Sequence, residues 1–440
     1  MRAALIVVTA LMIWGPPRLR LTSRPLETAL ANPADLDAAA LFQVLVWALG
    51  AVLIAVILGG RLLTGRRVFP ALVGNTSLRY YMLYFAVALA SAAYSVSPLY
   101  TVFSAAKIFV SIMAVALLTD RGSLSDRRPL ILRLFFLVNA AQWIVDGILY
   151  FAAPELVGTN IPLIGFRLNG GIFGDYGEAA ACAGLYFLSE AMFYSQRMSQ
   201  VIHWALYGLT WVFVAASRTR STIVATAVMF LAVILLYRRI TTRLIAVLGI
   251  FLVLAVFVVG GGVDPLVEFA MRGQKMSSLV TLTGRSQAFD FLYEQWKQAP
   301  WLGYGYGAGS RFLLVRFVKE TGLGIGSAHD ALSRVFCDLG IVGTLVLACA
   351  VAATAIEMFR LMKVTRSSPR AHALALQLIA LASFAFLKCI VSSGIAEAPF
   401  LVLITAVGAA IARWQARREY QGRWEPVVAT PALSFQASVR

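Results

Sequence analysis

Long apolar runs recur along this 440-residue chain, and they constrain its fold more than any other feature. A transmembrane helix needs about 20 mainly apolar residues. Only 13% of the residues are charged, whereas a soluble domain carries about a quarter. Candidate spans lie at 3–15, 40–60, 80–95, 100–119, 131–153, 178–195, 201–217, 221–237, 243–261, 340–359, 372–391 and 397–412. The sequence therefore predicts an all-α, polytopic integral membrane protein with about 12 transmembrane helices.

The net charge of +17 indicates membrane topology rather than nucleic-acid binding. If the spans alternate in direction, the basic clusters all fall on one side of the membrane; they lie at 61–79, 121–133, 238–243, 360–370 and 413–418. Cytoplasmic segments are enriched in Lys and Arg. The pattern predicts cytoplasmic termini, provided that the short segment 3–15 is a span and not a signal peptide. The absence of a convincing small-x-small cleavage site favours the span.

The chain divides into membrane bundles and one long outer loop. The predicted parts are an N-terminal bundle (1–261), a loop (262–330), C-terminal helices (331–413) and a cytoplasmic tail (414–440). The loop mixes charged and aromatic residues, so we expect helices that lie on the membrane surface. A loop this long in a compact protein is usually functional. Arg167, in the shorter outer segment 154–177, is a further candidate substrate contact.

One of the three histidines, His329, lies at the end of the long outer loop. Ser327 and Asp330 form the pattern of a capping box, which places His329 in the first turn of a helix. The positive end of the helix dipole favours the neutral imidazole, and a general base needs that form. Asp330, Arg334 and Asp338 recur at helical spacing and make one polar face. The alternative is an exposed loop histidine without a chemical role.

Three arginines are predicted on the same outer face, against the positive-inside trend. Arg218 and Arg220 precede the span 221–237, and Arg285 lies in the long loop. The guanidinium group is a planar fork of donors that suits phosphate. The sequence therefore predicts an anion site. The alternative is that these side chains snorkel to lipid headgroups.

Gly303-Tyr304-Gly305-Tyr306-Gly307 is not a dinucleotide fingerprint, because no strand or βαβ unit is expected around it. It is typical of a tight turn that follows a helix at 286–298. Tyr304 and Tyr306 are candidates for stacking on sugar faces. The alternative is that they belong to the aromatic belt of the membrane interface.

Ionisable groups inside spans are rare and usually functional. Lys107 and Asp146 lie at similar depth near the outer ends of their helices, so we expect them to pair. Lys388 and Glu397 flank the last outer hairpin, and we expect a second pair there. All four residues are candidates for lining a cavity that opens to the outer face.

Together these motifs resemble the O-antigen ligase and Wzy-type polymerase superfamily of bacterial envelope glycosyltransferases. The resemblance spans most of the chain. It rests on Ser217-Arg218-Thr219, Thr283-Gly284-Arg285, Pro300-Trp301-Leu302-Gly303-Tyr304-Gly305, and His329 followed by Gly340-Ile341-Val342-Gly343, with Tyr94-Ser95-Val96-Ser97-Pro98 as a weaker fifth motif.

The resemblance implies a GT-C-like fold in the bacterial inner membrane, with a periplasmic active site. It also implies inverting, metal-independent glycosyl transfer without a cofactor. On this basis Arg218, Arg285 and Arg220 would bind the donor diphosphate, and His329 would activate the acceptor hydroxyl. The family usually has Asn after this histidine, whereas this chain has Asp330. That carboxylate would pair with Arg334 or raise the pKa of the histidine.

Three functions remain open at this point. The Thr-Leu-Thr-Gly-Arg and Gly-Tyr-Gly-Tyr-Gly segments are closest to polymerases of O-antigen or exopolysaccharide repeat units. A ligase that transfers the glycan to lipid A core is the first alternative. A transporter or flippase is the second, although inverted repeats and broken mid-membrane helices are missing. The expected partners are an undecaprenyl-diphosphate-linked glycan donor, a glycan or lipid A core acceptor, and membrane lipids, with no nucleic acid.

Overall fold

The computed structural model describes residues 38–65, 75–120, 130–161, 165–168, 176–194, 197–217, 219–236, 285–321, 331–367 and 369–389, with a few isolated positions besides. The predicted spans 243–261 and 397–412 lie outside these residues, and 3–15 lies almost wholly outside them. The same holds for His329, Asp330, Arg218, Glu397 and the tail.

The described chain is helical apart from one short hairpin. The α-helices are α3 (Ala38–Leu63), α4 (Thr76–Ala90), α5 (Pro98–Asp120), α6 (Leu130–Ala152), α7 (Pro154–Val157), α8 (Tyr176–Ser189), α9 (Arg197–Ala216), α10 (Arg220–Leu236), α14 (Arg285–Gln298), α15 (Gly309–Thr321), α16 (Ala331–Val364) and α17 (Pro369–Cys389). Shorter turns are the 3-10 helices η2 (Ser91–Ala93) and η5 (Thr365–Ser367) and the π-helix η3 (Glu190–Tyr194).

Several of these helices are long and apolar enough to cross a membrane. Among the described residues, five meet that condition, at Val44–Leu63, Pro98–Leu117, Leu134–Ala152, Ala331–Val364 and His372–Cys389. The apolar segment Ser221–Leu236 is shorter. A helical membrane protein is therefore confirmed. The total of about 12 spans and the GT-C-like arrangement stay predictions.

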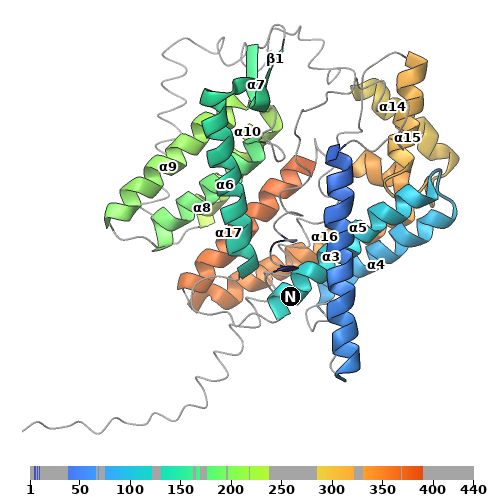
Figure 1. Cartoon of the computed structure of the whole chain (residues 1–440), viewed down its shortest axis with the longest axis horizontal. Coiled ribbons are helices and arrows are strands. Elements are labelled where there is room, and N and C mark those ends of the chain that lie inside the picture. The colour runs from blue at the N-terminus through green and yellow to red at the C-terminus, as the bar shows by residue number, and fades with distance from the viewer. Residues whose placement is uncertain are drawn as a thin grey trace, which may run out of the picture.

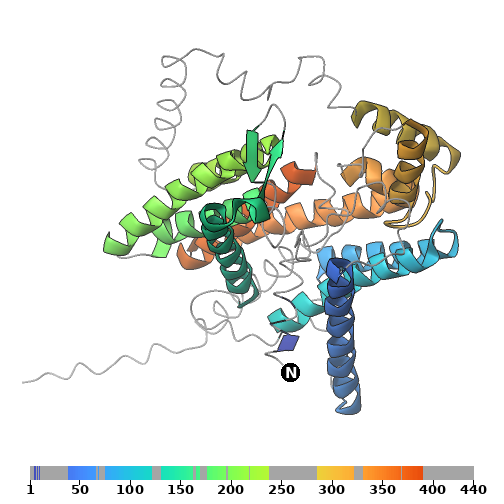
Figure 2. The same ribbon diagram turned by 45° about the horizontal axis from the view of Figure 1, so that its top comes forward.

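The helices form two groups that α16 connects (Figures 1 and 2). In one group α8 packs against α6 and α9, and α10 packs against α17. In the other group α4 and α5 pack together, and α3 contacts α5. Helix α16 contacts α17 at one side, and α4, α14 and α15 at the other. The two helices of the long loop, α14 and α15, are thus attached to the membrane part through α16.

Helix α8 is the centre of its group because its side chains are small. Its sequence, YGEAAACAGLYFLS, is buried along nearly its whole length. Small residues let the backbones of neighbouring membrane helices approach closely. At Gly184, for example, an added Cβ would lie 2.6 Å from the Thr210 hydroxyl and 2.8 Å from the Phe230 ring.

Helix α3 shows the opposite pattern. Leu45, Leu49, Val52 and Val56 recur at helical spacing, and each is more than half exposed. A stripe of exposed large apolar residues is unfavourable in water but suits contact with lipid tails. Helix α3 therefore has a face suited to lipid.

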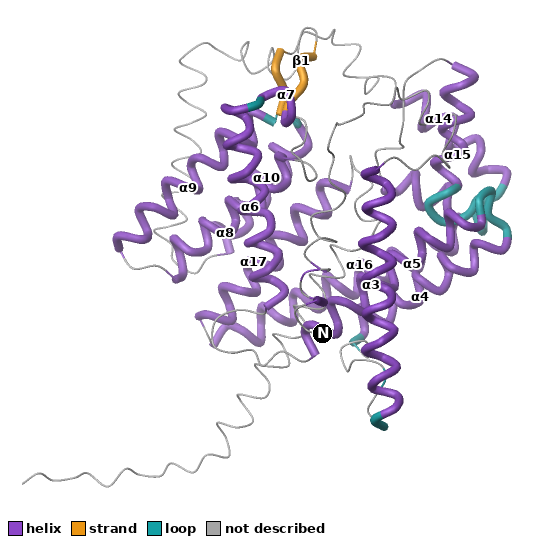
Figure 3. The backbone as a smooth tube through the Cα atoms, viewed as in Figure 1, coloured by secondary structure: helices purple, strands orange, loops and turns teal. Residues whose placement is uncertain are grey.

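The segment 154–177, which was predicted as a loop, contains a short β-hairpin. Strand β1 (Gly158–Ile161) pairs with strand β2 (Gly165–Leu168) in an antiparallel register, with Thr159 opposite Arg167. The hairpin follows α7 directly and extends beyond the ends of the helices (Figure 3). A purely α-helical fold was thus nearly right, and the hairpin is the exception.

Candidate functional site

A break inside α16 organises one end of the molecule. Gly340 has φ 61° and ψ −158°, so the helix is interrupted there. This backbone region is accessible to glycine and essentially closed to other residues. The interruption leaves backbone groups without helical partners. The turn that contains Pro300 satisfies them: the Ile341 N–H donates to the Pro300 carbonyl at 2.8 Å.

The glycine-rich turn lies next to this break, and the two backbones are in direct hydrogen-bonding contact. The Tyr304 N–H donates to the Cys337 carbonyl at 2.9 Å, and the Gly305 N–H donates to the Asp338 carbonyl at 2.8 Å. An added Cβ at Gly303 would lie 2.6 Å from the Cys337 carbonyl oxygen. The glycines are therefore required for contact between two backbones, and the predicted tight turn is confirmed.

The side chain of Asp338 ties the turn to the start of α15. Its two oxygens accept hydrogen bonds from the Gly307 N–H at 2.8 Å and the Ser310 N–H at 2.6 Å. The carboxylate is buried, and Arg334 lies beside it with Nε 3.7 Å from Oδ2. Arg334 and Asp338 thus share a helix face, as predicted. Asp338, however, is a buried structural residue that links α16 to the turn and to α15.

The segment 94–98 closes the turn from the other helix group. The Val96 N–H donates to the Tyr304 carbonyl at 3.1 Å. Gly305 lies directly against Ser95, where an added Cβ would clash with the side chain. Three motifs that carry the family resemblance therefore meet in one place. We call this assembly of residues 94–98, 300–310 and 337–343 the glycine joint.

The structure places both candidate tyrosines within the glycine joint. Tyr306 is 3% exposed, and its ring packs edge-on against Tyr84 at 5.8 Å between centroids. The Tyr304 hydroxyl donates to the Gln295 carbonyl at 2.8 Å and so links the turn to α14. Burial raises the pKa of Tyr304 above its usual value. Neither environment resembles an open platform for a sugar, and both residues serve packing.

A second polar cluster forms where α8, α10 and α17 meet. Lys388, in the last turn of α17, places Nζ 2.8 Å from Oε1 of Glu178 and donates to the Thr222 hydroxyl at 3.0 Å. Glu178 is in the first turn of α8, and Thr222 is in the first turn of α10. We call these three residues the Lys388 cluster. The expected partner Glu397 lies outside the described residues, and the pairing with Glu178 was not predicted.

The start of α10 is held against α8 by Gly177. An added Cβ there would lie 2.8 Å from the Ser217 hydroxyl and 3.0 Å from Thr222 Cγ2. The Ser217 hydroxyl donates to the Val214 carbonyl and accepts from the Thr219 N–H, so it stabilises the turn between α9 and α10. Ser217, just after α9, and Thr222, in the first turn of α10, therefore both lie against the start of α8.

Some of the predicted arginines lie on described elements, and others lie outside the described residues. Arg220 begins α10 and Arg285 begins α14, and helix N-termini favour anions. Arg167 lies in β2. The positions of these three side chains are not described, and Arg218 and His329 lie outside the described residues. His329 precedes α16 by two residues in the sequence, next to the helix that the glycine joint fixes.

The predicted ion pair between Lys107 and Asp146 is wrong. The Lys107 ammonium lies over the Phe103 ring, 5.4 Å from its centroid, on its own helix. Asp146 is fully buried on α6, close to Tyr176 of α8. Similar depth in the sequence prediction therefore did not bring the two side chains together: Lys107 contacts its own helix, and Asp146 lies near α8.

The surroundings of Asp146 are unusually polar for a membrane helix. Trp143 Nε1, Gln142 Nε2 and the Tyr176 hydroxyl are buried, and none has a hydrogen-bond partner among the described residues. Gln142 and Asp146 are one helical turn apart on α6. Tyr176 gave no signal in the sequence, because a tyrosine at the end of a span is ordinary.

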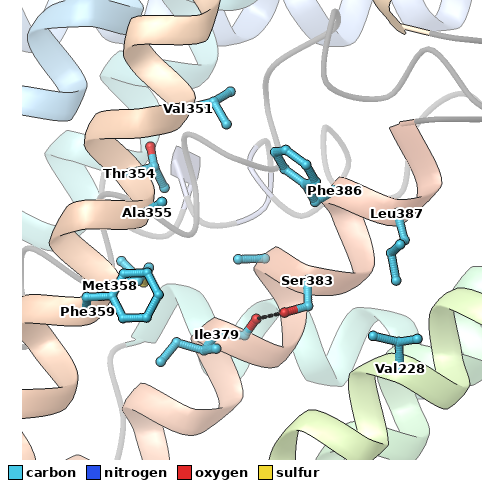
Figure 4. Close-up of a pocket in the computed structure, with 11 residues that line it drawn as sticks. Val228, Val351, Thr354, Ala355, Met358, Phe359, Ile379, Ser383, Phe386 and Leu387 are labelled. Atoms are coloured by element: carbon cyan, nitrogen blue, oxygen red, sulfur yellow. Dashed lines mark hydrogen bonds between the residues drawn. The ribbon is translucent and has the colours of Figure 1, made fainter.

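An apolar groove of about 350 Å³ lies between α10, α16 and α17. Figure 4 shows its lining, which includes Val228 from α10, Met358 from α16, and Phe386 and Leu387 from α17. The Ser383 hydroxyl on its wall donates to the Ile379 carbonyl at 3.0 Å, so its hydrogen is used within the helix. The groove follows α17 toward the Lys388 cluster and suits an apolar chain.

Glu178 and Thr222 were missed as candidate site residues. Each stands at the boundary of an apolar segment, where polar residues are common, and neither belongs to a recognisable motif. Glu178 is 210 residues from Lys388, so only the fold reveals their contact. The available signal was a single acidic residue at the start of the otherwise apolar α8.

Comparison with known proteins agrees with this arrangement. Residues 205–348 match the family model described as O-antigen ligase. The matched region begins in α9 and ends in α16, so it contains the Ser-Arg-Thr motif, the long outer loop and the glycine turn. No curated protein matches the chain significantly. This match over residues 205–348, about a third of the chain, supports the resemblance to the O-antigen ligase and Wzy-type superfamily.

Proposed function

We propose that the protein is an inverting glycosyltransferase that polymerises polyprenyl-diphosphate-linked oligosaccharide repeat units on the periplasmic face of the inner membrane. The observation that carries the proposal is the O-antigen ligase match together with cationic residues at neighbouring helix ends. Arg220 begins α10, and Lys388 contacts Thr222 in the same turn. Cations and helix N-termini are what a leaving diphosphate requires.

The chemistry follows from the charge that develops in the transfer. The acceptor hydroxyl attacks the anomeric carbon from the face opposite the diphosphate, and the bond from this carbon to the diphosphate oxygen breaks. Negative charge grows on the leaving diphosphate, and Arg218 and Arg285 neutralise it. His329 takes the proton of the attacking hydroxyl. No metal ion takes part in this proposal.

The membrane part supplies the binding of the donor lipid. The groove between α10, α16 and α17 is apolar and extends toward the Lys388 cluster, so it suits the polyprenyl chain. The sugars then lie on the outer side, where the long loop and the hairpin flank them. The glycine joint would hold α14, α15 and the start of α16 in fixed relative positions while the donor is bound.

A ligase is the second candidate, because the matching family model bears that description. The two enzymes differ in the acceptor. A polymerase extends a lipid-linked repeat, whereas a ligase transfers the finished glycan to lipid A core.

Reconstitution in proteoliposomes with a polyprenyl-diphosphate-linked repeat unit tests these functions. A ladder of products without a further acceptor supports the polymerase. Transfer only after lipid A core is added supports the ligase. Movement of the lipid across the bilayer without a new glycosidic bond would contradict both and indicate a transporter.

A further inference from the structure

The Lys388 cluster has a polar composition that packing alone does not explain. The buried Lys388 ammonium loses hydration, and well-packed apolar residues in place of a buried charge are often equally or more stable. Ionisable residues inside membrane spans are costly and usually belong to a substrate or ion path. Lys388 is the penultimate residue of the apolar span His372–Cys389. Lys388 is therefore a candidate for a role in binding a substrate or an ion, beyond stabilising the fold.

The two members of the pair differ in exposure. The Lys388 side chain is 9% exposed, whereas that of Glu178 is 42% exposed. The carboxylate is thus the outer member, and the ammonium lies behind it. An anion that approaches from the exposed side meets Glu178 first. Because Glu178 already contacts solvent, turning it away from Lys388 costs little desolvation.

One further contact and the sequence neighbours on α10 and α17 place the ammonium near the proposed donor site. The Thr222 hydroxyl, fully buried, accepts a hydrogen bond from Lys388 and fixes its position. Thr222 follows Arg220, the first residue of α10, by two residues, so Lys388 contacts the turn that Arg220 begins. On α17, Leu387 in the wall of the apolar groove directly precedes Lys388.

We propose that Lys388 is a further donor-binding cation, which Glu178 holds in the resting protein and releases to the diphosphate of the lipid-linked donor. The proposal rests on the proposed function and adds a residue pair to it. The diphosphate carries more negative charge than a carboxylate, and it reaches the cluster when the polyprenyl chain lies in the groove. Glu178 then competes with the donor for Lys388 and favours release of the diphosphate product.

Because Glu178 and the donor compete for Lys388, substitutions at the two residues should change the KM for the donor in opposite directions. Lys388→Met keeps most of the length of the side chain but removes its charge, so we expect the KM for the donor to rise about tenfold, as for the loss of one charged hydrogen bond. Lys388→Arg should restore most of the affinity. Glu178→Gln removes the competitor, and we expect the donor KM to fall severalfold.

Inorganic pyrophosphate is the second probe. As a competitive inhibitor it should bind more weakly to Lys388→Met and more tightly to Glu178→Gln. In the double variant the effect of Glu178→Gln should vanish, because it requires the ammonium. A pair with only a structural role gives a different result: both single variants lose thermal stability, and the donor KM and pyrophosphate inhibition stay at the wild-type values.

Matched controls come from the far end of α16. Glu357 accepts hydrogen bonds from the N–H and hydroxyl of Ser77, and Lys363 is exposed. Glu357→Gln and Lys363→Met should leave both constants unchanged. If the wild-type protein transfers no sugar, the proposed function fails. If it is active and the Lys388 and Glu178 variants keep wild-type constants, the pair's role alone is refuted.

Discussion

At the scale of single residues, His329 carries the chemistry of the proposal. His329→Ala should abolish glycosyl transfer while expression and donor binding persist, because the imidazole is proposed to act only on the acceptor hydroxyl. Transfer rate and donor binding are measured separately on the purified protein in nanodiscs. Wild-type activity in this variant would remove His329 from the mechanism.

Gly340 is a residue whose role is conformational. Gly340→Ala should destabilise the protein, because a side chain in the left-handed region costs roughly 1–2 kcal/mol and the new Cβ would lie 2.4 Å from the Trp301 carbonyl. Thermal unfolding in detergent measures the effect. Gly60→Ala is the control, since no atom lies within 4 Å of the added Cβ on helix α3. That variant should be as stable as wild type or slightly more stable.

The sequence predicted residues well where a local rule determines them. The glycines of the turn at 303–307 were expected to form a tight turn, and they do. Residue pairs across the fold were harder to predict. Lys107 and Asp146 have the right depth to pair, but the rotation of each helix about its axis cannot be read from depth. Lys388 was recognised as unusual, whereas its partner Glu178 is far away in the sequence.

At the scale of elements, Asp338 joins α16 to the glycine turn and to α15. Asp338→Ala should leave the N–H groups of Gly307 and Ser310 buried without their acceptor. Breaking a buried charged pair of this kind costs about 3–5 kcal/mol. Faster hydrogen exchange at both amides and a lower Tm are the expected readouts. Asp290→Ala, at an exposed carboxylate on α14, should change neither.

The groove between α10, α16 and α17 gives a prediction about chain length. Ala382→Phe places a ring in the groove, so we expect transfer from a donor with a full polyprenyl chain to fall severalfold. A donor with a short, water-soluble prenyl chain should be unaffected. Leu345→Phe, on the exposed face of α16, is the control. Equal loss with both donors would show that the groove does not hold the chain.

The helices themselves were largely predictable because apolar runs of span length have few alternative structures. Every predicted span from 40–60 to 221–237, together with 340–359 and 372–391, coincides with a described helix. The interruption of α16 was not predicted, since Gly340 looks like any glycine in an apolar run. Its conformation depends on a backbone 40 residues earlier in the sequence, at Pro300.

At the scale of the whole molecule, two assemblies of residues connect the described helices. The glycine joint connects the helix group of α4 and α5 with the long loop through backbone contacts. The Lys388 cluster connects the ends of α8, α10 and α17 through charged and polar side chains. Helix α16 carries the glycine joint near one end and, further along, lines the apolar groove together with α10 and α17.

The backbone contacts of the glycine joint have a consequence for mutational tolerance. A joint built from main-chain hydrogen bonds makes few demands on side chains that point away from it. Trp301 and Leu302 are 65% and 50% exposed, although their backbones lie against Gly340. In saturation mutagenesis scored by glycan production, tolerance to substitution should therefore differ sharply between neighbouring positions. Many residues should be accepted at 301 and 302, and glycine alone at 303, 305 and 340.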